Sequence, residues 1–247
     1  MLNELKAMAK SNVTRRSVLA GAGAVGAGSL LAACGGGGGS DTDVRWGNWT
    51  LYLDYDSDKK VYPTLEEFTA QTKIAVKYLE DYNDNDEFYG KVQGQLKLKK
   101  DIGYDLICPT DWMAARYIRL GYAQKLDKAN IPNAKNILPA LASVPYDTGR
   151  DYSLTWQGIM GGFTWNKEKL PKGVHTLDEL FAPANKGKIE VLTELRDTVG
   201  VIMLAQGVDI TKFTADEYYN ALDFLQKKIS DGFIRQVKGN DYKEDLI

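Results

Sequence analysis

Aromatic, hydroxyl and carboxylate side chains follow three of the predicted strands, and these residue types suit the binding of a positively charged group. The three segments are residues 48–52, 109–112 and 193–197. An aromatic face attracts a cation, and a carboxylate accepts charge-assisted hydrogen bonds from an ammonium group. Each tryptophan alone is equally well explained by core packing, but three such loops together favour a binding site. The candidate ligand-binding residues are Trp49, Thr50, Tyr52, Thr110, Asp111, Trp112, Glu194 and Asp197.

Two of these carboxylates also admit a catalytic interpretation. Glu194 and Asp197 are three residues apart near a predicted helix start, so a surface hydrolase that uses them as an acid/base pair is an alternative. Carboxylates at helix N-termini are commonly solvated groups that the helix dipole favours. Because no nucleophile and base accompany them, we expect no catalytic residue. A lipid-anchored interaction module without a small ligand is a third alternative.

The cysteine and histidine content disfavours metal and disulfide chemistry. The chain has two cysteines, Cys34 and Cys108, and one histidine, His175. Cys108 ends an apolar run, where we expect a small buried hydrophobic residue. His175 stands beside an apparent helix start, where a loop or cap role is expected. We therefore expect no metal site and no cofactor.

The first forty residues have the pattern of an export and anchoring signal. Arg15 and Arg16 precede an apolar, Gly/Ala-rich stretch that ends in Leu31-Ala32-Ala33-Cys34. Paired arginines before such a stretch resemble a twin-arginine export signal, and small residues before Cys34 resemble a lipoprotein cleavage site. The stretch 18–33 is shorter than the roughly 20 residues that span a bilayer. We expect a signal peptide over 1–33, a lipidated Cys34, and a glycine-rich tether over 34–43.

The charge balance bears on the class of partner. The chain carries 31 Lys and Arg against 33 Asp and Glu, and loss of the first 33 residues changes the net charge from -2 to -5. A mildly acidic protein is a poor partner for nucleic acid and is compatible with a cationic ligand. We therefore expect no nucleic-acid partner.

From Val44 onward the sequence alternates between strand patterns and helix patterns. This alternation predicts an α/β fold with a largely parallel sheet, which would position the candidate residues. Strands are expected at 44–49, 74–79 and 104–108. Open α/β sheets place ligand crevices at the carboxyl ends of their strands, where residues 48–52 and 109–112 fall. Helices are expected to begin at a Thr64-x-x-Glu67 capping box, at Asp86 and near Asp111. In the first helix Leu65 and Phe68 are expected to point inward, and in the second Phe88, Val92 and Leu96 share one face. The third helix is marked by Met113, Tyr117 and Leu120.

The second half of the chain predicts a further unit. Residues 130–151 indicate a wrapping connection, and short strands are expected at 152–156 and 162–166 around a glycine bend at 158–162 that would cross between lobes. A helix capped by Thr176-x-x-Glu179, a strand at 189–192 and a helix at 197–206 follow. A last helix begins at Thr214-x-x-Glu217, with Tyr218, Leu222, Leu225 and Ile229 inward. We expect lobes at 44–158 and 159–247, the second with too few strands to close a sheet.

These motifs resemble the spermidine/putrescine-type periplasmic binding proteins of polyamine uptake systems, over most of residues 44–240. The resemblance implies a two-lobed type II periplasmic-binding-protein fold that closes by hinge motion, a polyamine ligand and an ABC permease as partner, and we expect a monomer. The matching segments are Asn48-Trp49-Thr50-x-Tyr52, Tyr104-Asp105-Leu106 leading into Pro109-Thr110, Gln124-Lys125-Leu126-Asp127, and Tyr152-Ser153-Leu154.

The resemblance also implies roles for the candidate residues. Trp49, Thr50 and Tyr52 would meet one end of the ligand. Thr110 and Trp112 would line the first lobe's wall, while Glu194 and Asp197 would hold ammonium groups. Relatives often carry an acid where this chain has Leu51, so Asp54 or Asp111 would have to substitute, and another cationic or zwitterionic solute is the alternative. Relatives also continue beyond this length, so we expect an incomplete second lobe, exposed apolar surface and weak or absent binding.

Overall fold

The structure is a computed structural model that describes residues 43–246, all within one compact unit, Thr42–Ile247. The expected signal peptide, the lipidation site Cys34 and nearly all of the tether lie outside the described residues.

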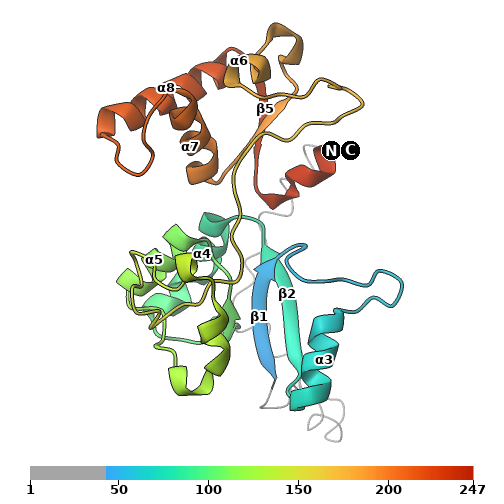
Figure 1. Ribbon diagram of the computed structural model, residues 1–247, viewed down its shortest axis with the longest axis vertical. Helices are drawn as coiled ribbons and strands as arrows, with labels where there is room; N and C mark the ends of the chain where they lie inside the picture. The colour runs from blue at the N-terminus through green and yellow to red at the C-terminus, as the bar shows by residue number, and fades with distance from the viewer. Residues whose placement is uncertain (1–42, 247) are drawn as a thin grey trace, which may run out of the picture. The chain divides into compact units, whose positions relative to one another are not determined.

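A three-stranded parallel sheet forms what we call the first lobe (Figure 1). Its strands are β1 (Val44–Trp49), β2 (Val76–Tyr82) and β3 (Leu106–Ile107), in the order β2-β1-β3. β1 is the central strand, and Trp46 stands opposite both Tyr78 and Leu106. Gly47 leaves room for a neighbouring ring, because a Cβ there would lie 2.9 Å from Cδ1 of Tyr104. The predicted parallel sheet is confirmed, although β2 begins and ends later and β3 is shorter than expected.

Three helices accompany this sheet in the predicted βαβαβα order: α3 (Pro63–Thr72), α4 (Asn85–Lys97) and α5 (Asp111–Arg119). Figure 1 shows α3 on one side of β1 and β2, with α4 and α5 on the other. Phe88 and Val92 of α4 are buried against Trp49 and Tyr82, as their four-residue spacing predicts. Met113 and Tyr117 of α5 are buried against α4 through Tyr89. The core therefore fixes the start of α4 and α5 at the carboxyl ends of the strands.

Two predicted helix starts are wrong. Thr64 does not cap α3, because the helix begins at Pro63, whose fixed φ and missing N–H suit a first helical position, and the cap residue Tyr62 makes no side-chain cap bond. Asp84, and not Asp86, caps α4 by accepting a hydrogen bond of 2.8 Å from the backbone N–H of Glu87. The inward position expected for Phe68 is also wrong, since its side chain is exposed.

The connection after α5 consists of 3-10 turns at Lys128–Asn130, Pro132–Asn136 and Pro139–Leu141, as a wrapping segment should. The short strands expected at 152–156 and 162–166 are wrong, because both stretches are irregular. The carboxylate of Asp147 accepts hydrogen bonds from the backbone N–H groups of Asp151, Tyr152 and Ser153. These N–H groups are therefore not available to a strand ladder.

A second sheet of two parallel strands, β4 (Ile189–Leu192) and β5 (Ile234–Lys238), forms what we call the second lobe. The strand β5 was not predicted. The helices are α6 (Leu177–Leu180), α7 (Leu195–Ala205) and α8 (Ala215–Ser230), with 3-10 turns at Pro183–Asn185 and Asn240–Leu246. Thr176 and Thr214 cap α6 and α8 as predicted. Ala221 is the residue of α8 buried against α7, whereas Ile229, expected inward, is exposed.

Within residues 43–246 no helix has the length and apolar character needed to traverse a bilayer.

Candidate functional site

The turn between β4 and α7 brings a second-lobe carboxylate against the first lobe. Glu194 occupies the cap position of α7. Its Oε1 accepts a hydrogen bond from the indole N–H of Trp112, and its Oε2 accepts one of 2.7 Å from the amide of Asn85. Burial raises the pKa of the Glu194 carboxyl, and these two hydrogen bonds oppose that rise by favouring the ionised form. Glu194 is therefore a half-buried carboxylate with both oxygens engaged.

Asn85 links this carboxylate to the loop after β3. Its amide Nδ2 lies 2.7 Å from the hydroxyl of Thr110, and its Oδ1 accepts a hydrogen bond of 3.2 Å from the backbone N–H of Thr110. The asparagine is 1% exposed. Thr110, Trp112 and Glu194, which are far apart in the sequence, are thereby joined into one hydrogen-bonded group.

Two further contacts connect the same turn to the first lobe. The guanidinium of Arg196 pairs with Asp111 at 2.5 Å, and the hydroxyl of Thr193 donates to Asp84. Both members of the ion pair are more than half exposed, so the pair contributes little stability. The pair matters for binding, because the positive charge of Arg196 partly neutralises Asp111. Asp111 would therefore attract an ammonium group less strongly.

Asp197 is the second half-buried acid of the turn. Burial raises the pKa of its carboxyl, the charge of Arg196 lowers it, and the charge of Asp111 raises it. A Cβ added at Gly161 would lie 3.0 Å from Oδ1 of Asp197, so a side chain there would require the carboxylate to shift by a few tenths of an ångström. The glycine bend at 158–162 thus lies beside this acid, while its predicted role as a crossing between lobes stays a prediction.

Two aromatic residues lie at the end of β1, where Trp49 is the last residue of the strand and Tyr52 follows in the loop. Tyr52 is half-buried, and burial raises the pKa of its phenol, with a smaller effect from the charge of Asp197. Trp49 is 8% exposed, and its indole N–H donates to the backbone oxygen of Cys108 at 2.7 Å. The rings of Trp49 and Tyr52 have centroids 6.1 Å apart. Trp49 thus supports Tyr52 from the core, and its own contact with a solute stays a prediction.

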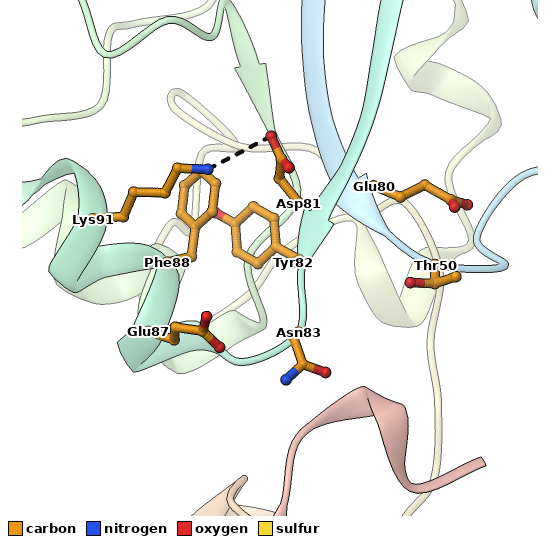
Figure 2. Close-up of a pocket in the computed structure, with 8 residues that line it drawn as sticks. All are labelled: Thr50, Glu80, Asp81, Tyr82, Asn83, Glu87, Phe88 and Lys91. Carbon is orange, nitrogen blue, oxygen red and sulfur yellow. Dashed lines mark ion pairs between the residues drawn. The ribbon is translucent and has the colours of Figure 1, made fainter. Parts of the chain in front are cut away.

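Thr50 points into a different place, a hollow of about 450 Å³ at the carboxyl end of β2 (Figure 2). The hollow contains three carboxylates and one lysine, Lys91, whose Nζ lies 3.7 Å from Asp81. Leu51, in the left-handed region at φ 64, donates its backbone N–H to Glu80 in the wall. The other lining residues are Asp81, Tyr82, Asn83, Glu87 and Phe88. The hollow is acidic, and Thr50 is the predicted site residue that lines it.

The structure thus assembles most of the predicted residues and adds one. Tyr52, Thr110, Trp112, Glu194 and Asp197 are connected by hydrogen bonds or mutual electrostatic influence. Sequence reasoning missed Asn85, because an asparagine at a helix start is normally explained by capping. The signal that could have found it is Asp84: with the cap placed there and not at Asp86, the next polar residue has no local role.

Other chemistry has less support in this part of the chain. The substitute acid Asp54 accepts a hydrogen bond from the backbone N–H of Thr64. Burial raises the pKa of the Cys108 thiol to about 11, which fits a packed residue and not a reactive thiolate. No group of three metal-ligating side chains occurs among residues 43–246.

The chain forms two parallel sheets, and the helices that follow their strands begin beside Thr110, Trp112 and Glu194. This arrangement is a two-lobed α/β solute-binding fold. Solved structures confirm the expected type II periplasmic-binding-protein fold. A spermidine/putrescine ABC transporter protein from Listeria monocytogenes matches with a TM-score of 0.62 at 21% identity, covering 82% of this chain and 59% of that one. The TpPotD lipoprotein of Treponema pallidum matches with a TM-score of 0.66 at 20% identity, covering 83% and 62%.

The family is shown by sequence. The family model "bacterial extracellular solute-binding protein" matches residues 64–246, and the chain belongs to this family. The spermidine/putrescine-binding periplasmic protein of Escherichia coli is 29% identical over 205 residues, which are 81% of this chain and 57% of that protein. The putrescine-binding periplasmic protein SpuD of Pseudomonas aeruginosa is 32% identical over 151 residues, 58% of this chain and 38% of that protein. The chain thus spans less than two thirds of these relatives, and the hydrolase alternative finds no support among them.

Proposed function

We propose that this protein is the substrate-binding component of an ABC uptake transporter and that it binds a small cationic solute, in the first instance a polyamine. The observation that carries the proposal is the pair of half-buried acids Glu194 and Asp197 beside Trp112 and Tyr52. Acids at this depth attract ammonium groups more strongly than exposed acids do, because less water screens them. Aromatic neighbours add a favourable surface for the cation and its methylene groups.

The proposal extends to how the protein is held and what it meets. Lipid attached at Cys34 would keep the protein at the outer face of the cytoplasmic membrane after export, with the glycine-rich segment as a tether. A monomer would deliver its solute to the permease without changing it chemically. The names of the relatives support the ligand class alone, through the polyamines that they record.

Isothermal titration calorimetry on protein expressed from its native gene tests the ligand class. Putrescine and spermidine are expected to release heat with saturable binding, whereas 1,4-butanediol, which has the length of putrescine without its charges, is expected to release none. Absence of heat with both amines would overturn the polyamine proposal. Chromatography of the solute after incubation should return it unchanged, and a new product would favour the hydrolase alternative.

A further inference from the structure

Asn85 is a fully buried polar side chain beside Glu194, and it makes hydrogen bonds in two directions. It is 1% exposed, so it is not available to contact a solute directly. Its Nδ2 lies 2.7 Å from the hydroxyl oxygen of Thr110 and 2.7 Å from Oε2 of Glu194. Its Oδ1 accepts from the backbone N–H of Thr110. An amide has two N–H donors, and both find acceptors here.

This arrangement fixes the orientation of the amide. A flipped side chain would place the amide oxygen against the Glu194 carboxylate and the NH₂ group against the Thr110 N–H. Acceptor would then face acceptor, and donor would face donor. The first lobe thus presents a donor of fixed direction to a second-lobe acid. Trp112 supplies a donor to the other oxygen, so the plane of the carboxylate is defined by two first-lobe groups.

We propose that Asn85 is a positioning residue for solute binding, which acts through Glu194 by holding its carboxylate ionised and in a fixed orientation. The inference rests on the proposed function in naming the solute as a cation. Each carboxylate oxygen has two lone pairs, so the hydrogen bonds from Asn85 and Trp112 leave capacity for an ammonium group.

The charges around Glu194 make the Asn85 hydrogen bond important. The carboxylates of Asp197 and Asp84 act on Glu194, and both negative charges raise the pKa of its carboxyl. The nearby cation Arg196 is paired with Asp111. Burial and these two charges raise the pKa of Glu194, and the hydrogen bonds from Asn85 and Trp112 lower it. Loss of the Asn85 hydrogen bond would therefore raise the pKa of Glu194.

Two substitutions separate the donor from the bulk of the side chain. Asn85→Leu keeps the approximate size of the side chain but removes its donor and acceptor without adding charge, and Asn85→Ala removes the bulk as well. Asn130→Ala is the matched control, because its amide also donates to a carboxylate, that of Asp127 at 2.9 Å, on an exposed turn. Circular dichroism and melting curves establish which variants fold, and either Asn85 variant that folds carries the test.

The first readout needs no solute. Carbon NMR titration of the Glu194 carboxyl, assigned from its disappearance in Glu194→Gln, is expected to show a higher pKa in both Asn85 variants and no change in Asn130→Ala. The second readout is putrescine affinity by calorimetry at neutral pH, which is expected to fall about tenfold or more in the Asn85 variants only.

An unchanged Glu194 titration overturns the inference, and so does a raised pKa with unchanged putrescine affinity. A third outcome is that the Asn85 variants raise the pKa of Glu194 while the unsubstituted protein binds no amine. That result would support the effect of Asn85 on Glu194 and overturn the proposed polyamine binding. The two failures are therefore distinguishable.

Discussion

At the scale of residues, the two acids of the β4–α7 turn are more protonated at a given pH than exposed acids would be. Burial is the largest cause of the raised pKa for both Glu194 and Asp197. An acid whose pKa is raised in the folded state contributes stability below its unfolded pKa, and this contribution is lost as pH rises through the folded value. At neutral pH both acids therefore favour unfolding slightly, a stability disadvantage that a bound cation would remove.

The first prediction follows from the destabilising effect of the ionised Asp197 at neutral pH. Asp197→Asn removes a desolvated charge, so its melting temperature at pH 7 is expected to equal or exceed that of the unsubstituted protein. Its putrescine affinity is expected to fall at least tenfold, about 1.4 kcal/mol, because the ammonium group loses a charged partner. Calorimetry and melting curves check both, and a large drop in both would indicate a structural role instead.

A second prediction concerns pH. Putrescine affinity is expected to fall as pH drops, starting at a higher pH than the ordinary range of exposed carboxyl groups, because the raised pKa values make both acids accept protons sooner. Titrations in steps between pH 7 and 4 measure this. Affinity that stays constant down to pH 4 would contradict the assignment of these acids.

Trp49 gives a third prediction with two separable readouts. The side chain is 8% exposed and packs against Tyr82, so Trp49→Ala is expected to cost about 3–5 kcal/mol of unfolding free energy in chemical denaturation. Trp49→Phe keeps an aromatic ring and loses the hydrogen bond to Cys108, which is expected to cost less. If Trp49 also meets the solute, amine affinity falls in a folded Trp49→Phe variant, whereas unchanged affinity would assign the residue to the core alone.

At the scale of elements, identical sequence motifs have different outcomes. Thr64-x-x-Glu67 and Thr214-x-x-Glu217 both fit a capping box, but only the second forms one. Thr214 accepts from the N–H of Glu217, and the Glu217 carboxylate accepts from the N–H of Thr214. The proline at position 63 starts α3 two residues earlier than a Thr64 cap would, so Thr64 lies inside the helix.

This difference makes a fourth prediction. Thr214→Ala is expected to lower the free energy of unfolding by about 1 kcal/mol, because it removes a helix cap. Thr64→Ala, at a helical position, is expected to change it by less than about 0.5 kcal/mol. Urea denaturation of both variants measures the contrast, and equal losses would contradict the assigned caps.

At the scale of the whole molecule, solute binding should couple to stability. A ligand that binds only the folded state stabilises it by about 2.7 kcal/mol at a concentration one hundred times its Kd. A fifth prediction is that saturating putrescine raises the melting temperature of the protein and leaves that of a Glu194→Gln/Asp197→Asn variant nearly unchanged. An equal rise in both would place the amine elsewhere, with the acidic hollow beside Thr50 and Glu80 as the first place to look.

Much of the fold follows from the sequence, because local signals specify it. The strand at 189–192, the four-residue spacing of Phe88 and Val92, and the caps at Thr176 and Thr214 all depend on neighbours within one turn or strand. The missed strand β5 depends on a distant partner, whereas the wrong strand near Tyr152 was excluded by a nearby side chain that takes its backbone donors. β5 pairs with β4 more than forty residues earlier, and the N–H of Tyr152 bonds to Asp147.

The sequence by itself determined the chemistry available to this protein: a set of aromatic, hydroxyl and acidic residues at the ends of parallel strands, where helix starts leave polar groups unsatisfied. Only the tertiary structure decided which of them meet. It buried Trp49 beneath Tyr52, paired Asp111 with Arg196, and placed Asn85 against Glu194, 109 residues later in the chain. The physical reason is that residue type sets what a group can bind, whereas burial and neighbouring charge, which arise only on folding, set its orientation and ionisation.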